Sequence, residues 1–279
     1  MPSAGRDGLM RRRRGGMVRL LHRGDEAVVV HARAASDAVR LRAEGSSAEA
    51  AAWGLDRMRF ALCLDHDLSE FHRRFARDPL VGPAIRRRPW LRPWRTPQPF
   101  EALAWAICEQ LIETERAWSI ERRLVWRFGR RSACGTLRDA PTARAVAGRA
   151  PAELQACDLS AGRSLALIRS AREVADGRAD LRRHEHAWRR LRRVPNVGSW
   201  TLEKLAFHGQ GRDDQLPAGD LAYLKLVGAL AGLGRRATEE EVRAFFTAYA
   251  PYEALAGIYA LSAVRSAPTR DPRPPAARS

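Results

Sequence analysis

The sequence predicts a mostly helical protein that is preceded by a small α+β domain. β-branched residues and apolar–basic alternation between residues 18 and 42 are typical of strands. From residue 99 onward, apolar residues recur at spacings of three and four, which is typical of helices with one buried face. The chain of 279 residues is 45% hydrophobic and contains eight tryptophans, so it can fold around a sizeable core. A disordered polycation is thereby excluded.

The chain is strongly basic, with 49 Lys and Arg residues against 32 Asp and Glu and a formal net charge of +17. This charge favours a polyanionic partner such as nucleic acid. Because only Lys204 and Lys225 are lysines, a generally arginine-rich composition would explain the same charge. No segment approaches the roughly 20 uncharged residues that a membrane span needs. We therefore expect a cytoplasmic protein that associates with the nucleoid and has no membrane partner.

Composition divides the chain into four regions. Residues 1–16 are rich in Gly and Arg and residues 266–279 are rich in Pro, so both are predicted to be disordered tails. Residues 17–65 form the small α+β domain, with strands between 18 and 42, a helix over 47–60 and a further strand at 62–64. Residues 66–265 form an all-helical domain.

The helices of this second domain follow from the apolar spacing. The first carries Phe100, Leu103, Ala104, Ile107 and Leu111 on one apolar face. The same argument predicts helices near 115–129, 162–176, 184–193, 199–208, 220–233, 239–249 and 252–264.

A tight turn at residues 194–199 joins two of these helices. The first helix ends at Arg193, Pro195-Asn196-Val197-Gly198 forms the turn, and the second helix begins at Ser199. Asn196 tolerates the left-handed region, and Gly198 suits a positive φ or a close approach. Backbone N–H groups at the start of the second helix suit an anion such as a DNA phosphate. An ordinary pair of helices joined by a turn is the alternative.

Asp220 stands at the start of the apolar helix predicted at 220–233, which makes it a good N-cap. A carboxylate held there can also stabilise an oxocarbenium-like sugar and orient or deprotonate a water molecule. The two roles are compatible.

Together these segments resemble the helix-hairpin-helix DNA glycosylases of the HhH-GPD superfamily, above all the 3-methyladenine DNA glycosylase II branch. PNVGSWT is similar to the family's P-G-x-G-x-W-T hairpin, and LPAGDL is similar to its F-P-A-x-D-L loop, at the family's own separation. PFEALAWAICEQLI, DLSAGRSLALI and APYEALAGIYAL resemble three further family segments in the same order, so the likeness covers about residues 65–265. It implies two helical lobes that flank a cleft, preceded by the small α+β domain.

The resemblance implies a DNA glycosylase of base excision repair that acts on duplex DNA with damaged bases. It makes Asp220 the catalytic residue and Leu111 the wedge that fills the gap left by a flipped nucleotide. It assigns phosphate binding to Asn196, Gly198 and Thr201, and the base pocket to Trp200, Lys204, Gln110 and Tyr259.

Trp200 occupies the position at which lyase-type relatives carry the Schiff-base lysine, so the resemblance implies a monofunctional hydrolase of alkylated bases of the 3-methyladenine type. It also implies a monomer without cofactor. The four cysteines lie far apart and none follows Cys157, so we expect no iron–sulfur cluster, although hairpin carbonyls could hold a monovalent cation.

The chain departs from the branch at three positions. Asn196 replaces the first hairpin glycine, Glu253 stands where Arg is common, and Lys204 stands where a pocket aromatic is usual. Lys204 would repel a cationic base unless Glu203 or Asp220 neutralises it. Two alternatives therefore stay open: a non-catalytic helix-hairpin-helix protein that binds DNA, or a glycosylase with lyase activity through Lys204 on another lesion.

Overall fold

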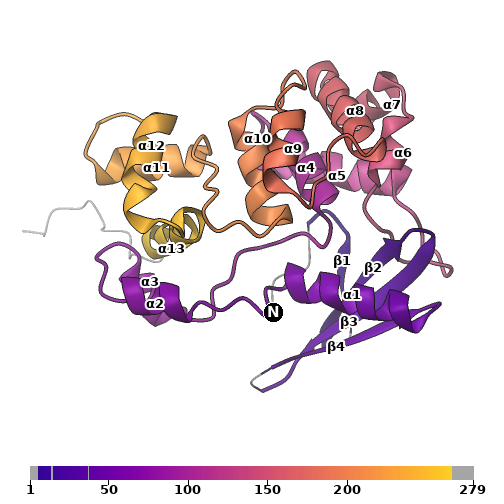
Figure 1. Cartoon of the computed structure of the whole chain (residues 1–279), viewed down its shortest axis with the longest axis horizontal. Coiled ribbons are helices and arrows are strands. Elements are labelled where there is room, and N and C mark those ends of the chain that lie inside the picture. The colour runs from indigo at the N-terminus through magenta and orange to yellow at the C-terminus, as the bar shows by residue number, and fades with distance from the viewer. Residues whose placement is uncertain (1–5, 14, 37, 266–279) are drawn as a thin grey trace, which may run out of the picture. The chain divides into compact units, whose positions relative to one another are not determined.

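A computed structural model describes residues 6–13, 15–36 and 38–265 of the chain. It has two compact units, each built from two segments (Figure 1). The first contains the chain up to His66 together with Arg92–Pro217, and the second contains Asp67–Leu91 together with the chain from Ala218 onward. The N-terminal sheet is therefore grouped with the helices of the first unit. The predicted tail at 266–279 lies outside the described residues.

The first unit begins with an antiparallel sheet whose strand order follows the chain. The strands are β1 Met10–Arg13, β2 Gly16–Arg23, β3 Glu26–Ala34 and β4 Val39–Gly45. Helix α1, Ala48–Ala61, is capped by the Ser47 side chain and lies across one face of the sheet (Figure 1). A β-carbon on Gly54 of α1 would come within 2.5 Å of Val28 on β3, so glycine permits this close approach.

Two predictions for this segment were wrong. Residues 10–13 do not belong to a disordered tail, because Met10 is buried in the core beneath α1 and β1 pairs with β2. Residues 62–64 form a turn instead of a strand, since the chain ends α1 there and Cys63 adopts a φ of +52°.

The remaining helices of the first unit pack around α4, Pro99–Glu109, whose side chains from Phe100 to Cys108 are all buried. The others are α5 Thr114–Phe128, α6 Ala143–Ala147, α7 Pro151–Gln155, α8 Ala161–Ala175, α9 His184–Leu191 and α10 Ser199–Lys204, which continues as a π-helical turn over Leu205–Gly209. The short helices α6 and α7 were not predicted, because five residues are too few to show a period.

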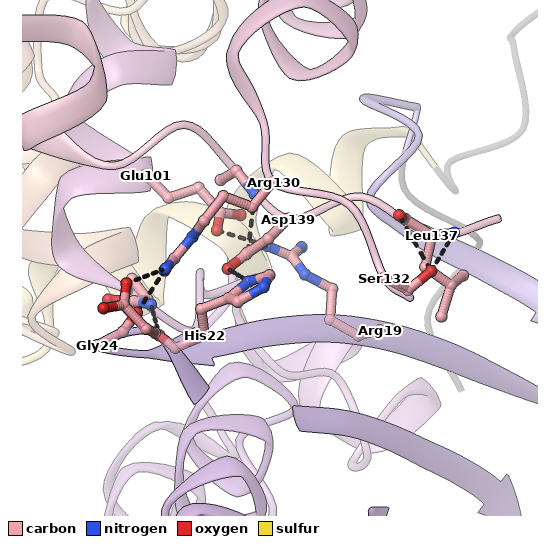
Figure 2. A network of polar contacts seen from close by, with 11 residues as sticks. Arg19, His22, Gly24, Glu101, Arg130, Ser132, Leu137 and Asp139 are labelled. Carbon is pink, nitrogen blue, oxygen red and sulfur yellow. Dashed lines mark hydrogen bonds and ion pairs between the residues drawn. The ribbon is translucent and has the colours of Figure 1, made fainter. Parts of the chain in front are cut away.

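A buried charge network joins the sheet to the helices of this unit (Figure 2). Arg19 on β2 donates to Glu101 on α4 at 2.6 Å, and His22 lies 3.1 Å from Asp139. Burial raises the pKa of Glu101 to about 7, against the attraction of Arg19. Arg130 donates to the Gly24 carbonyl at 2.5 Å. The network thus fixes the β2–β3 hairpin to the helical part of the unit.

A second buried carboxyl makes the stability of the first unit depend on pH. Glu121 on α5 is 2% exposed, and burial, with repulsion from Glu109 and Asp7, raises its pKa from 4.5 to about 9. At a pH between 4.5 and about 9, Glu121 is ionised in the unfolded chain but protonated in the folded chain. The free energy of unfolding therefore falls as pH rises through this window.

Glu121→Gln should remove this dependence. Through Glu121, the free energy of unfolding of the wild type should fall with rising pH, and that of the variant should lack this fall. We therefore expect the difference between variant and wild type to increase by about 3 kcal/mol between pH 5 and pH 7. Urea unfolding at both pH values measures it. Glu115→Gln, on the exposed side of the same helix, serves as the control and should show no growth. An advantage that stays constant with pH would contradict the raised pKa of Glu121.

The second unit is wholly helical in its described part. Its elements are α2 Ser69–Phe75, α3 Gly82–Arg87, α11 Leu221–Leu230, α12 Glu239–Phe246, a 3₁₀ turn over Thr247–Tyr249, and α13 Glu253–Arg265. Aromatic rings fill its core: Phe71 lies 5.2 Å from both Phe75 and Tyr259, measured between ring centroids. The predicted fold class, mostly helical with a small N-terminal sheet, is confirmed.

Candidate active site

The predicted turn between two helices is present in the first unit. α9 ends at Leu191 and α10 begins at Ser199. Asn196 adopts a φ of +66°, which confirms the predicted left-handed conformation. Gly198 is extended instead, with a φ of −96°, and a β-carbon there would meet nothing within 4 Å. Of the two expectations for Gly198, the positive φ is therefore not found, whereas the space beside this residue is open to the close approach of a ligand.

Gln110 ties the end of α4 to this hairpin. Its side-chain amide donates to the carbonyl of Asn196 at 2.7 Å and to the hydroxyl of Thr201 at 2.8 Å. Thr201 is only 2% exposed, so its side chain is used inside the protein and does not face a phosphate. The structure therefore gives Gln110 a positioning role toward the hairpin, where the sequence had suggested a place in the base pocket.

Leu111, the next residue, does not continue the apolar face of α4. The helix ends at Glu109, and Leu111 is fully exposed with a φ of +53°. For a residue with a branched side chain this conformation costs about 1–2 kcal/mol. A leucine that is both strained and solvated gains nothing from packing within the chain. Its placement suits a side chain that enters a bound partner.

Lys204 is neutralised by an acid other than the two that were predicted. Its ammonium group forms an ion pair with the carboxylate of Glu109, at the end of α4, and lies 5.3 Å from the centroid of the Trp200 ring. The predicted candidates were Glu203 and Asp220. Glu109 precedes Gln110 directly, but no local pattern points to it, because the contact joins residues 95 positions apart.

Asp220 lies in the second unit and caps α11 as predicted. One carboxylate oxygen, Oδ1, accepts a hydrogen bond from the backbone N–H of Ala222 at 2.9 Å. Within the described part of the chain, Oδ2 makes no hydrogen bond, and the side chain is partly exposed. The start of α11 thus holds the carboxylate in place through Oδ1 and leaves Oδ2 available to a ligand.

Tyr259 was predicted to line the base pocket, but it is fully buried within the second unit. Its hydroxyl donates to the carbonyl of Leu91 at 3.0 Å and lies 2.9 Å from the His72 ring. A side chain without exposed surface cannot stack on an extruded base, so we assign Tyr259 to the core of this unit.

No three His, Cys, Asp or Glu side chains in the described part of the chain gather closely enough to bind a metal ion. No helix there is sufficiently long and apolar to pass through a bilayer.

Known proteins resemble the chain in sequence and in fold. A curated relative from Bacillus subtilis (strain 168), named DNA-3-methyladenine glycosylase, is 23% identical over 203 residues, which are 70% of this chain and 67% of the relative. The fold matches that of a 3-methyladenine DNA glycosylase from Archaeoglobus fulgidus with a TM-score of 0.77 at 22% identity, over 90% of this chain and 87% of the other.

A second solved structure is an 8-oxoguanine glycosylase/lyase from Clostridium acetobutylicum in complex with double-stranded DNA. It matches with a TM-score of 0.73 at 16% identity, covering 94% of this chain and 89% of that one. Residues 104–251, more than half of the chain, match the family model described as "HhH-GPD superfamily base excision DNA repair protein". The chain therefore belongs to the HhH-GPD superfamily of base excision DNA repair proteins.

Proposed function

We propose that this protein is a monofunctional DNA glycosylase that flips alkylated purines of the 3-methyladenine type out of duplex DNA and hydrolyses their glycosidic bond. The observation that carries the proposal is the Asp220 carboxylate, held by the first turn of α11 with Oδ2 left for a reactant. Membership of the superfamily and the names of the Bacillus and Archaeoglobus relatives support the reaction and the substrate class.

Cleavage of the glycosidic bond needs only modest catalysis when the base is already cationic. The C1′–N bond breaks and its electron pair leaves on the alkylated base, which neutralises the positive charge of the base. Positive charge then develops on the deoxyribose, where a nearby carboxylate stabilises it electrostatically. Water adds to C1′, and its proton passes to Oδ2 of Asp220. None of these steps needs a cofactor.

The first unit would supply the main contacts with DNA. Backbone N–H groups in the first turn of α10 are unused by the helix itself, and the open space beside Gly198 lets a phosphate approach them. Leu111 would enter the duplex where the nucleotide has left, and Trp200 would stack on the extruded base. Carbonyl groups of the hairpin are the candidate ligands for a monovalent cation.

The pairing of Lys204 with Glu109 favours hydrolysis over lyase chemistry. A Schiff base requires a neutral amine, and the adjacent carboxylate stabilises the protonated ammonium. Borohydride reduction during the reaction tests this point. We expect no covalent protein–DNA adduct, whereas an adduct that disappears in Lys204→Ala would show that the lyase alternative is correct.

The proposal as a whole is tested with duplex DNA methylated by dimethyl sulfate. We expect the protein to release free 3-methyladenine, identified by chromatography, from this DNA and not from unmethylated DNA. If the protein binds the duplex in a salt-sensitive manner but releases no base, the non-catalytic alternative is favoured.

Leu111→Ala should weaken base release without affecting the fold. The exposed side chain contributes no packing, so we expect the free energy of unfolding to change by less than about 0.5 kcal/mol. Without the Leu111 side chain, nothing fills the gap that the flipped nucleotide leaves in the duplex, so the flipped state is less stable. Base release should therefore slow by about tenfold or more. Single-turnover kinetics on a duplex with one lesion measures this rate.

The matched control is Leu165→Ala, which removes a half-exposed leucine from α8. It should leave the rate of release unchanged. Equal rates for Leu111→Ala and the wild type would show that Leu111 does not enter the DNA.

A further inference from the structure

An arginine-lined groove lies beside the hairpin in the first unit. Its volume is about 410 Å³, and its walls come from α8, the loop that follows it, α9 and the start of the hairpin. Five arginines line it against a single carboxylate, that of Glu173.

The carboxylate does not balance these charges. Glu173 already pairs with two of the arginines, Arg178 at 3.2 Å and Arg190. The other three are Arg169, Arg172 and Arg193, and none of them forms an ion pair with a carboxylate of the described residues. Arg172 donates through Nε to the Ala147 carbonyl at 3.0 Å, which orients its guanidinium. The groove thus holds three uncompensated, exposed positive charges.

The groove is continuous with the hairpin. Val194 and Pro195, which open the turn, form part of its wall. At the other side of the turn, a β-carbon on Gly162 in the first turn of α8 would lie 3.3 Å from the Asn196 side chain. Arg169 and Arg172 follow along the same helix, about 10–15 Å further on. The positive charges therefore extend away from the hairpin in one direction.

We propose that this groove binds the sugar–phosphate backbone of the duplex on one flank of the hairpin contact. The inference rests on the proposed function only for the identity of the polyanion. Guanidinium groups pair with phosphates through two parallel hydrogen bonds, and such contacts position a duplex without reading its sequence. The groove lengthens the footprint of the protein on DNA beyond the hairpin.

The experiment measures the salt dependence of binding to an undamaged, fluorescein-labelled duplex by fluorescence anisotropy, so that no base release is required. The variant Arg169→Gln/Arg172→Gln/Arg193→Gln removes the three uncompensated charges and spares the pairs around Glu173. The control Arg13→Gln/Arg33→Gln/Arg40→Gln removes the same charge from a row of exposed residues on the sheet. Circular dichroism confirms that both variants are folded.

For the groove variant we expect the slope of log Kobs against log[KCl] to become less steep by about 2–3, since each lost phosphate contact removes about 0.9. Its affinity should fall by about tenfold at low salt, and the control should keep the wild-type slope. An unchanged slope in the groove variant, or an equal loss in both variants, would overturn the inference.

A set of duplexes shortened on one side or the other of an abasic-site analogue adds an independent test. The wild type should lose affinity when one particular flank is shortened, and the groove variant should not respond to the same shortening. Equal responses of the two proteins on both flanks would overturn the inference. Because these are binding measurements, they stand apart from the base-release assay that decides the proposed function.

Discussion

Asp220→Asn is expected to slow base release by about a hundred- to a thousandfold while keeping the affinity of the protein for duplex DNA. Asn is as good an N-cap as Asp, so the first turn of α11 should stay formed and the fold should not change. The amide, however, carries no negative charge to stabilise the sugar cation and cannot accept a proton from water. Losses of this size are typical when one group that stabilises transition-state charge is removed.

Single-turnover release from a methylated duplex, with anisotropy for DNA affinity, measures both quantities. Thr238→Asn is the matched control, because Thr238 caps α12 in the same unit through its side chain. This substitution should leave base release unaffected. If Asp220→Asn released base within about fivefold of the wild-type rate, which is well below the loss expected for a catalytic group, Asp220 would be a helix cap only.

Arg19→Met is expected to give the largest loss of stability. The substitution leaves Glu101 and Asp139 buried without their cation, and breaking a buried ion pair in this way costs about 3–5 kcal/mol. We expect a fall in Tm of about 10 °C, measured by calorimetry at pH 8. The loss should be smaller at pH 5, because Glu101, whose pKa burial raises to about 7, then takes up a proton.

The double variant Arg19→Met/Glu101→Leu should recover part of this stability, since it removes the unpaired carboxylate as well. Arg42→Met is the control, because Arg42 forms an exposed pair with Glu44 on the same sheet. A loss of less than about 1 kcal/mol for Arg19→Met, which is the value of a surface pair, would show that the network in Figure 2 does not hold the sheet to the helices.

Local patterns in the sequence predicted much of the fold. β-branched alternation located β2, β3 and β4, and apolar spacing located the longer helices. The N-cap at Asp220 and the left-handed Asn196 were also predictable, because both depend on neighbouring residues only. β1 was missed because its four residues are mostly arginine and become a strand only by pairing with β2.

The candidate site was less predictable because its contacts are long-range. Glu109 meets Lys204 and Gln110 meets the hairpin across more than 80 positions of sequence. The exposure of Leu111 depends on where α4 ends, and periodicity extended the helix to Leu111, past its actual end at Glu109. Tyr259 lies on α13, which is apolar on most of its surface. Only the tertiary packing determines which face of this helix is buried, so the burial of Tyr259 could not be predicted.

The most direct test of the central claim is to follow one alkylated base in a labelled duplex. The reaction is quenched with and without alkali, and the released base is identified by mass spectrometry. Hydrolytic excision predicts free 3-methyladenine together with a strand that stays intact until alkali cleaves the abasic site. A strand cut by the protein without alkali, or bound DNA from which no base is released, would contradict it.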